Sequence, residues 1–286
     1  MYSFFAIVIS LFIANFFSLN ILEYSFAFAK SGGVVDFKND EKYILISPEL
    51  INSYRCVFNT NTNGFFLQMR NTAFGIGVPG VVENNAFSYT FAIGTWYHIA
   101  VSRSGTTVYG FVNGSLISSG SNSTNYTQNG AWLGALNDAS QTVFGYISNF
   151  RLTKGQALYT ATFTPSTSAL TTTSQGATAS NVSLLTCQSN ASFDNNKSVD
   201  VRANTTSNLN FTRTGTPTVS SFSPYGTMWS NYFDGNGDVF SIPHDTKLDL
   251  GSGDFTVEFW LYAISWSSGT GGLLGKKAND TTNGWQ

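Results

Sequence analysis

The clearest hydrophobic pattern is the stretch "GTWYHIAVSRSGTTVYGFVNG", residues 94–114, in which two runs of aromatic and β-branched residues flank a polar segment. Across residues 95–103 apolar side chains occupy both alternating sets of positions, which is typical of a strand buried on both faces. "SRSGTT" predicts a turn and residues 108–112 predict the partner strand. The Asn-Gly pair at 113–114 then favours a tight turn into a third strand, "SLISS". The pattern predicts an antiparallel meander.

Three further runs predict strands: "AWLGAL" at 131–136, "VFGYISNFRL" at 143–152 and "FTVEFWLY" at 255–262. In the second run, Tyr146, Ile147, Phe150 and Leu152 cannot share one face of a regular strand, so we expect a bulge or burial on both faces. The third run alternates in the manner of a strand with one apolar face. Its members are Phe255, Val257, Phe259 and Leu261 on one side and Thr256, Glu258, Trp260 and Tyr262 on the other.

An internal repeat appears between "NTNTNGFF" at 59–66 and "NDTTNGWQ" at 279–286. A period of about 220 residues is too long for a solenoid and fits tandem domains joined by a linker. The region 171–226 is rich in Ser, Thr and Asn, with short apolar islands, and predicts a linker that carries a strand or two.

The N-terminal 29 residues are apolar and contain no acid or base before Glu23. The run from Phe4 to Phe17 suits the hydrophobic part of a signal peptide, and Ala27-Phe28-Ala29 offers a cleavage pattern. An uncleaved anchor is a second interpretation, because residues 2–22 are long enough to cross a bilayer. The structural alternative is that this segment forms core strands.

Composition agrees with a β-protein that has polar, uncharged loops. Aromatic residues make up 15% of the chain and charged residues only 10%, with 27 Gly; Ser, Thr, Asn and Gly fill the segments between apolar runs. The net charge of −2 and scattered Lys and Arg argue against a nucleic-acid partner. The two cysteines, Cys56 and Cys187, form either one disulfide or, as the simpler interpretation, two buried thiols.

Three passages together carry a resemblance to a known family: residues 94–120, residues 145–170 ("GYISNFRLTKGQALYTATFTPSTSAL") and residues 231–262 ("NYFDGNGDVFSIPHDTKLDLGSGDFTVEFWLY"). They resemble the LamG-like family of concanavalin A-type jelly-roll lectin domains. The resemblance implies two antiparallel sheets packed face to face, with ligands on a concave face or at loops on one rim. Residues 1–50 lack the family's opening motif, which 231–262 contains.

We therefore expect an all-β protein: an antiparallel two-sheet jelly-roll sandwich, concanavalin A-like, followed by an incomplete second copy. The predicted divisions are a signal-like or anchor segment at 1–29, a first jelly roll at 30–170, a linker at 171–226 and the N-terminal part of a second jelly roll at 227–286. In an alternative arrangement, residues 229–286 lend strands to the first domain.

Sugar binding commonly uses an exposed aromatic ring flanked by amides and hydroxyls. The most loop-like aromatic is Tyr126 in "NSTNYTQNG". The predicted glycan-binding rim is Tyr126, Asn129, Trp132, Asn137 and Asp138. The alternative for Trp132, and more strongly for Trp96, is a core position.

The resemblance implies one possible cofactor, calcium, because lectin domains of this type often fix a loop with a hard cation held by oxygen ligands. The candidate ligands are Asn137 and Asp138 in "LNDAS", and Asp234, Asn236 and Asp238 in "FDGNGD". Tight turns need the same residue types, so turn chemistry is the competing explanation.

Catalytic motifs are absent from the sequence. Glucanases on this architecture use paired carboxylates on one strand, whereas Glu258 stands alone in its strand. No nucleophile elbow accompanies the two histidines, and His98 suits a packed, hydrogen-bonded position. The predicted function is a non-catalytic carbohydrate-binding or adhesion module at a cell, virion or other extracellular surface, with glycans and further tandem domains as partners. A structural spacer without a ligand is the alternative.

Overall fold

The computed structural model describes residues 25–28, 43–46, 55–60, 64–78, 82–127, 130–190, 211–226 and 228–266. The chain separates into two compact units, one formed by residues 51–271 and one by residues 1–50 with 272–286. In the smaller unit, β1 (Ser25–Phe28) and β2 (Tyr43–Ile46) pair in parallel. The predicted signal or anchor segment, apart from β1, lies outside the described residues. Among the described helices, none has the length and apolar character needed to span a membrane.

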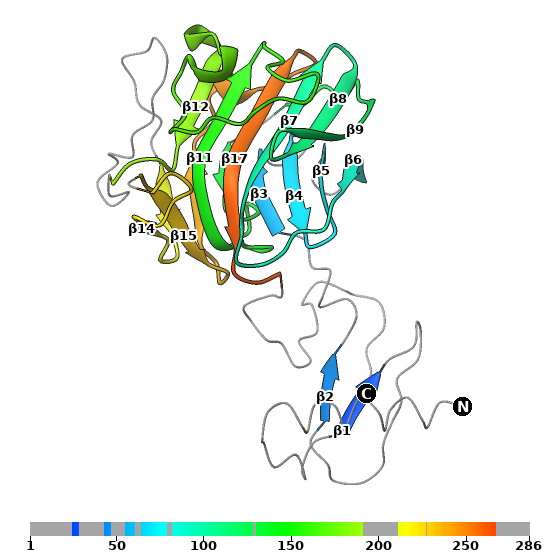
Figure 1. Ribbon diagram of the computed structural model, residues 1–286, viewed down its shortest axis with the longest axis vertical. Helices are drawn as coiled ribbons and strands as arrows, with labels where there is room; N and C mark the ends of the chain where they lie inside the picture. The colour runs from blue at the N-terminus through cyan, green and yellow to red at the C-terminus, as the bar shows by residue number, and fades with distance from the viewer. Residues whose placement is uncertain are drawn as a thin grey trace. The chain divides into compact units, whose positions relative to one another are not determined.

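The larger unit is a sandwich of two antiparallel sheets (Figure 1). The seven-stranded sheet has the spatial order β13-β16-β10-β3-β4-β5-β6. Its strands are β3 (Arg55–Asn59), β4 (Phe66–Arg70), β5 (Ala73–Val78), β6 (Val82–Ser88), β10 (Ala131–Leu133), β13 (Thr212–Thr214) and β16 (Val239–Ile242).

The eight-stranded sheet has the order β14-β15-β11-β17-β7-β8-β9, with β12 paired to β11 beside this path. Its strands are β7 (Trp96–Ser104), β8 (Thr107–Val112), β9 (Ser115–Ser121), β11 (Phe144–Lys154), β12 (Val182–Thr186), β14 (Thr218–Ser220), β15 (Ser230–Asp234) and β17 (Phe255–Ala263). In the described connections lie three short 3-10 helices: η1 (Ser174–Gly176), η2 (Ala179–Asn181) and η4 (Thr246–Leu248).

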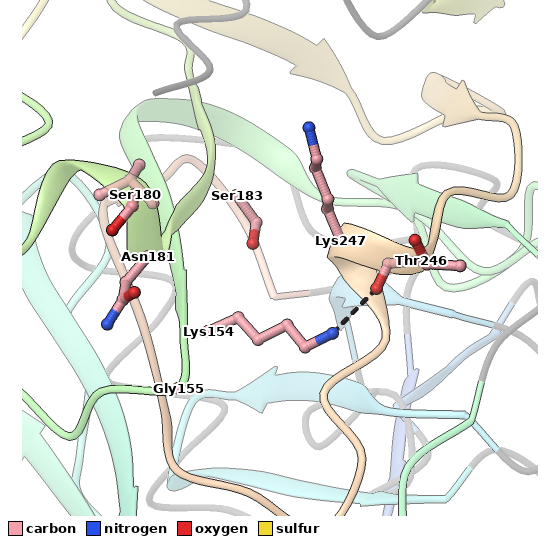
Figure 2. A pocket seen from close by; sticks show the side chains of 8 residues that line it. Lys154, Gly155, Ser180, Asn181, Ser183, Thr246 and Lys247 are labelled. Atoms are coloured by element: carbon pink, nitrogen blue, oxygen red, sulfur yellow. Dashed lines mark hydrogen bonds between the residues drawn. The ribbon is translucent and has the colours of Figure 1, made fainter. Parts of the chain in front are cut away.

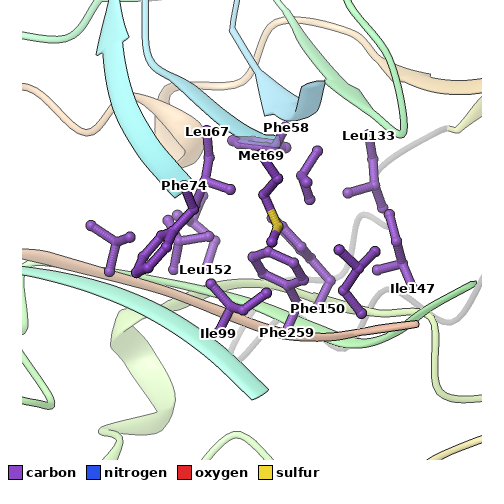
Figure 3. Close-up of a cluster of buried hydrophobic side chains, with 14 of the residues drawn as sticks. Phe58, Leu67, Met69, Phe74, Ile99, Leu133, Ile147, Phe150, Leu152 and Phe259 are labelled. Carbon is purple, nitrogen blue, oxygen red and sulfur yellow. The ribbon is translucent and has the colours of Figure 1, made fainter. Parts of the chain in front are cut away.

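The hydrophobic core fills the space between the two sheets (Figure 3). Phe58 of β3 faces Phe150 of β11 across this space, with ring centroids 5.1 Å apart. Leu67, Ile99 and Phe259 in the same cluster are fully buried. The predicted two-sheet antiparallel sandwich is therefore confirmed.

The predicted meander is also confirmed, because β7, β8 and β9 pair in sequence with antiparallel register. In β11 the register with β17 shifts between Ser148 and Arg151. Asn149 has a φ of 52° at this bulge. The extra residue lets Ile147 and Phe150 both enter the core, which resolves the conflict in the sequence pattern.

Strands from late in the chain complete the sandwich. β17 lies in the middle of the eight-stranded sheet, between β11 and β7, and β16 lies between β13 and β10. This differs from the predicted division at residue 227, since the described residues 228–266 belong to the same compact unit as β3–β11. The arrangement is the predicted alternative, in which this segment supplies strands to the first domain. The repeated sequence at 279–286 lies outside the described residues.

The predicted linker also contributes to the sandwich. β12 pairs with β11, β13 with β16 and β14 with β15. Leu184 of β12 is fully buried in the main core. The described parts of 171–226 are thus integral to the two sheets.

Candidate functional site

A row of four aromatic side chains crosses four neighbouring strands on the outer face of the eight-stranded sheet. Strand register places Tyr232 of β15 opposite Tyr146 of β11, Tyr146 opposite Tyr262 of β17, and Tyr262 opposite Trp96 of β7. Their ring centroids are 5.0, 6.0 and 5.5 Å apart in that order. All four rings are half-buried. We call these residues the aromatic row.

The alternation of each strand explains why the aromatic row faces outward. Phe233, Ile147 and Leu261, each next in sequence to a member of the row, point into the core. Because successive side chains of a strand lie on opposite faces, the members of the row that adjoin these three residues must lie on the outer face. With strands about 4.8 Å apart, four of them give the row a length of about 14 Å.

Phe222 lies across the aromatic row. Its ring centroid is 4.8 Å from that of Tyr262, 5.0 Å from that of Tyr146 and 5.4 Å from that of Trp96. Phe222 itself is 43% exposed. The row and Phe222 therefore form a continuous, partly solvent-exposed aromatic surface.

Trp260 is the next outward-facing residue of β17 and separates this surface from a charged cluster. Its Nε1 donates a hydrogen bond to the Tyr225 hydroxyl over 2.7 Å, and its ring meets His98 edge to face at 5.3 Å. Burial raises the pKa of the Tyr225 hydroxyl to about 12, against the opposing effect of the Trp260 hydrogen bond. Tyr225 is thus a neutral hydroxyl that fixes the indole.

A buried charged cluster occupies the same outer face beyond Trp260. Glu258 accepts a hydrogen bond from Arg151 Nε at 2.8 Å and one from the Tyr159 hydroxyl at 2.9 Å. His98 Nε2 lies 3.2 Å from Glu258 Oε2 and donates to it, since a carboxylate can only accept. His98 is 1% exposed, so the predicted packed, hydrogen-bonded histidine is confirmed.

The segment 155–176 covers this cluster. Arg151 donates to the carbonyl oxygens of Thr171 and Ser174 at 2.7 and 2.9 Å. Tyr159 stacks on Phe163 with centroids 3.6 Å apart and an interplanar angle of 4°. The outer face is therefore divided into a sealed charged end and an aromatic end that reaches solvent.

The electrostatics keep Glu258 ionised. Burial alone would raise the pKa of the Glu258 carboxyl, but the hydrogen bond from His98 and the charge of Arg151 outweigh it and hold this pKa below its usual range. Burial, and then the charge of Glu258, raise the pKa of the Tyr159 hydroxyl, which remains a donor. A carboxylate with these partners and no exposed surface is a structural anion.

The structure does not bring the predicted glycan rim together. Tyr126 is 1% exposed and packs edge to face on Phe65 at 5.3 Å, so the exposed ring expected there is a core residue. Its burial follows from the pairing of Tyr126 with Gly251, which draws the loop onto the sandwich. Trp132 is half-buried on β10, where its neighbours Ala131 and Leu133 enter the core, so it lies on the outer face of the other sheet. Asn129 lies outside the described residues.

The two predicted calcium loops display turn hydrogen bonds. Asp238 is fully buried and accepts the amides of Thr216 and Asp234 at 2.6 and 2.8 Å. Asp234 in turn accepts the amide of Asn236 at 2.7 Å. Both oxygens of Asp238 are thereby engaged, which fits turn chemistry better than a cation site.

The second predicted calcium loop behaves in the same way. Asp138 Oδ1 accepts the amide of Ser140 at 2.9 Å and its hydroxyl at 2.5 Å, and Asn137 is exposed. Over the described residues, no group of three or more His, Cys, Asp or Glu side chains could hold a metal ion. Calcium at either loop stays a prediction.

The sequence interpretation missed the aromatic row. The sequence pattern favours a core position for Trp96 and predicts only a strand position for Tyr262. The one available signal was the alternation of side chains along the strand. Tyr262 and Trp260 alternate with the apolar residues of the same strand and therefore lie on its opposite face. Strand order was needed to bring Tyr232 and Tyr146 beside them.

Comparison with known proteins identifies the class of domain. Residues 46–162 match the family model described as the concanavalin A-like lectin/glucanases superfamily. This part of the chain is therefore similar to a domain of that superfamily. The match includes β3 to β11 and ends before β12, so the later strands that complete the sandwich lie beyond it. No curated protein and no solved structure matched the chain.

Proposed function

We propose that the sandwich is a non-catalytic carbohydrate-binding module whose ligand lies along the aromatic row. The single observation that carries this proposal is the four-strand row of half-buried rings with Phe222 across it. Sugars present C–H faces that pack on aromatic rings, and the Tyr hydroxyls of the row can pair with sugar hydroxyls. Because the row extends over about 14 Å, several rings can contact one ligand.

The charged cluster supports the absence of catalysis. Glycosidases that use two catalytic carboxylates need both carboxylates to reach the scissile bond. Glu258 is instead 0% exposed, tied to Arg151, and covered by the segment 155–176. The superfamily includes both lectins and glucanases, and this arrangement favours the binding role.

The proposal includes an extracellular, cell-surface or virion-surface location, with glycans as partners. Its support is the apolar N-terminal segment at 1–29 and the low charge of the chain. Further tandem domains are proposed from the repeat of 59–66 at 279–286.

A glycan array followed by titration calorimetry on the best ligand tests the proposal. We expect Tyr262→Ala to weaken binding about tenfold or more, because one stacking ring is lost. Trp132→Ala is the matched control: it removes a half-buried ring from the outer face of the opposite sheet and should leave affinity unchanged. Loss of binding in Trp132→Ala alone would move the site to the other sheet.

Two further outcomes are informative. A protein that binds no glycan on the array would overturn the proposal and favour the structural spacer. Repeating the titration with a chelator tests calcium, since loss of binding on chelation would identify a cation requirement, for which Asp138 and Asp234 are the candidate ligands.

A further inference from the structure

A polar pocket lies at the end of β11 that is opposite to the aromatic row. A pocket of about 350 Å³ opens between the end of β11, the η2–β12 junction and η4. Tyr146 and Lys154 are eight residues apart on β11, which separates the pocket from the row by roughly 26 Å.

Six of the eight residues that line this pocket have side chains that can donate hydrogen bonds, and the other two are Gly155 and Val182. Lys154 and Lys247 contribute ammonium groups, Ser180, Ser183 and Thr246 contribute hydroxyls, and Asn181 contributes an amide. Figure 2 shows Lys154 extending from β11 toward Thr246, with Ser180 and Asn181 on the other side. Among the described residues, no acidic side chain lines the pocket.

The positive charge of the pocket is not neutralised within the described structure. Lys154 Nζ donates one hydrogen bond, over 2.9 Å, to the carbonyl oxygen of Thr246, and this leaves two of its three N–H groups. Neither lysine pairs with a carboxylate in the described part of the chain. The nearby Asp245 accepts the backbone amide of Lys247, and Asp249 lies 3.8 Å from His244.

Such a pocket is unusual for this chain. The whole sequence has only 14 Lys and Arg among 286 residues, with a net charge of −2. Two of these cations line one pocket together with three hydroxyls, and the Lys247 side chain extends away from the Lys154 ammonium (Figure 2). Ammonium and hydroxyl groups are the donors that bind oxyanions, since charge-assisted hydrogen bonds to them are short and strong.

We propose that this pocket binds a small oxyanion, either a free ion such as sulfate or a sulfate or carboxylate substituent on a saccharide. Lys154 lies within the pocket and supplies the fixed charge, because its ammonium is already oriented by Thr246. Lys247 supplies the second charge at the rim from η4. The inference is independent of the aromatic row.

The test is an NMR titration of the amides with sodium sulfate against sodium chloride at equal ionic strength. We expect sulfate-specific shifts at Gly155, Asn181 and Lys247 that chloride does not produce. We expect Lys247→Gln to weaken sulfate binding about tenfold, the loss typical of one charge-assisted hydrogen bond. Arg213→Gln removes an exposed cation from β13, outside the pocket, and should leave sulfate affinity unchanged.

The ligand source is resolved by a second pair of titrations, with galactose 6-sulfate and with galactose. Tighter binding of the sulfated sugar than of inorganic sulfate assigns the oxyanion to a saccharide, and equal binding assigns it to the free ion. Equal shifts with sulfate and chloride, or unchanged sulfate affinity in Lys247→Gln, would overturn the proposal. Lys247 lies at the rim of the pocket, in the short 3-10 helix η4. The Lys247→Gln variant should therefore fold, and a melting curve verifies this.

Discussion

Arg151 and Glu258 form a buried ion pair between the adjacent strands β11 and β17. Arg151 Nε donates to Glu258 Oε1 over 2.8 Å, and neither side chain is more than 1% exposed. The two residues are directly opposite in the strand register. They link the middle of the eight-stranded sheet to the segment 155–176 through Thr171 and Ser174.

Breaking this pair should destabilise the sandwich strongly. We expect Glu258→Gln to lower the free energy of unfolding by about 3 kcal/mol or more, because Arg151 becomes a buried charge without a counterion. Urea unfolding followed by tryptophan fluorescence measures the change. The double variant Arg151→Met with Glu258→Gln carries neither charge and should recover part of the loss; equal stability of Glu258→Gln and the wild type would contradict this role.

Stability should also decrease in acid. The folded protein holds the pKa of Glu258 below the ordinary value of 4.5, so the unfolded chain binds the proton more readily. The contribution of ionised Glu258 to the free energy of unfolding is therefore complete above pH 4.5. It is lost as the pH falls through the lower pKa of the folded state. Unfolding free energies measured from neutral pH downward should show this decrease. In Glu258→Gln the decrease should be smaller, and identical slopes would contradict the assignment.

The contact between Gly110 and Phe87 should tolerate no added methyl group. A Cβ on Gly110 would lie 2.4 Å from the Phe87 ring, where strand β8 of one sheet meets β6 of the other. We expect Gly110→Ala to destabilise the fold by about 1–3 kcal/mol through overpacking. Gly253→Ala is the control, since its nearest neighbour would be 4.0 Å away. Equal melting temperatures for the two variants would refute this contact.

Removal of β17 should prevent folding of the sandwich. A chain that ends at residue 226 lacks β15, β16 and β17, and leaves β11 and β7 as two unpaired edges around a missing central strand. We expect this chain to lose cooperative thermal unfolding and to bind a hydrophobic dye. If it still melts cooperatively, strands β3–β12 fold without the later segment, as two independent domains would require.

Both cysteines should resist alkylation in the native state. Cys56 and Cys187 are free and buried, and burial raises the pKa of each thiol well above its usual range. Because the thiolate is the reactive form, iodoacetamide should modify neither residue until the protein unfolds. Mass spectrometry with and without urea measures this, and rapid modification of either thiol in buffer would contradict the burial.

Local patterns predicted most of the individual strands. The alternation in 255–262 and the meander pattern in 94–121 predict strands without any knowledge of which strands pair with them. In 143–152 the apolar residues cannot all lie on one face of a regular strand, and this predicted the bulge. The order of strands could not be predicted in the same way. The position of β17 between β11 and β7 depends on pairing over more than one hundred residues, which no periodicity encodes.

The candidate site was harder to predict for the same reason. Trp96, Tyr146, Tyr232 and Tyr262 are far apart along the chain and become one surface only through register. Loop location favoured Tyr126, yet the bridge to Gly251 buries it. The lysine pocket likewise depends on η4 reaching the end of β11.

The place of β17 has a consequence for biosynthesis. The ribosome releases the neighbours of this strand, β7 and β11, more than one hundred residues before β17 itself emerges. Until then β7 and β11 lack the strand that lies between them in the native sheet, so the backbone groups that pair with β17 have no partner there. Completion of the native eight-stranded sheet must therefore wait until residues 255–263 have been synthesised.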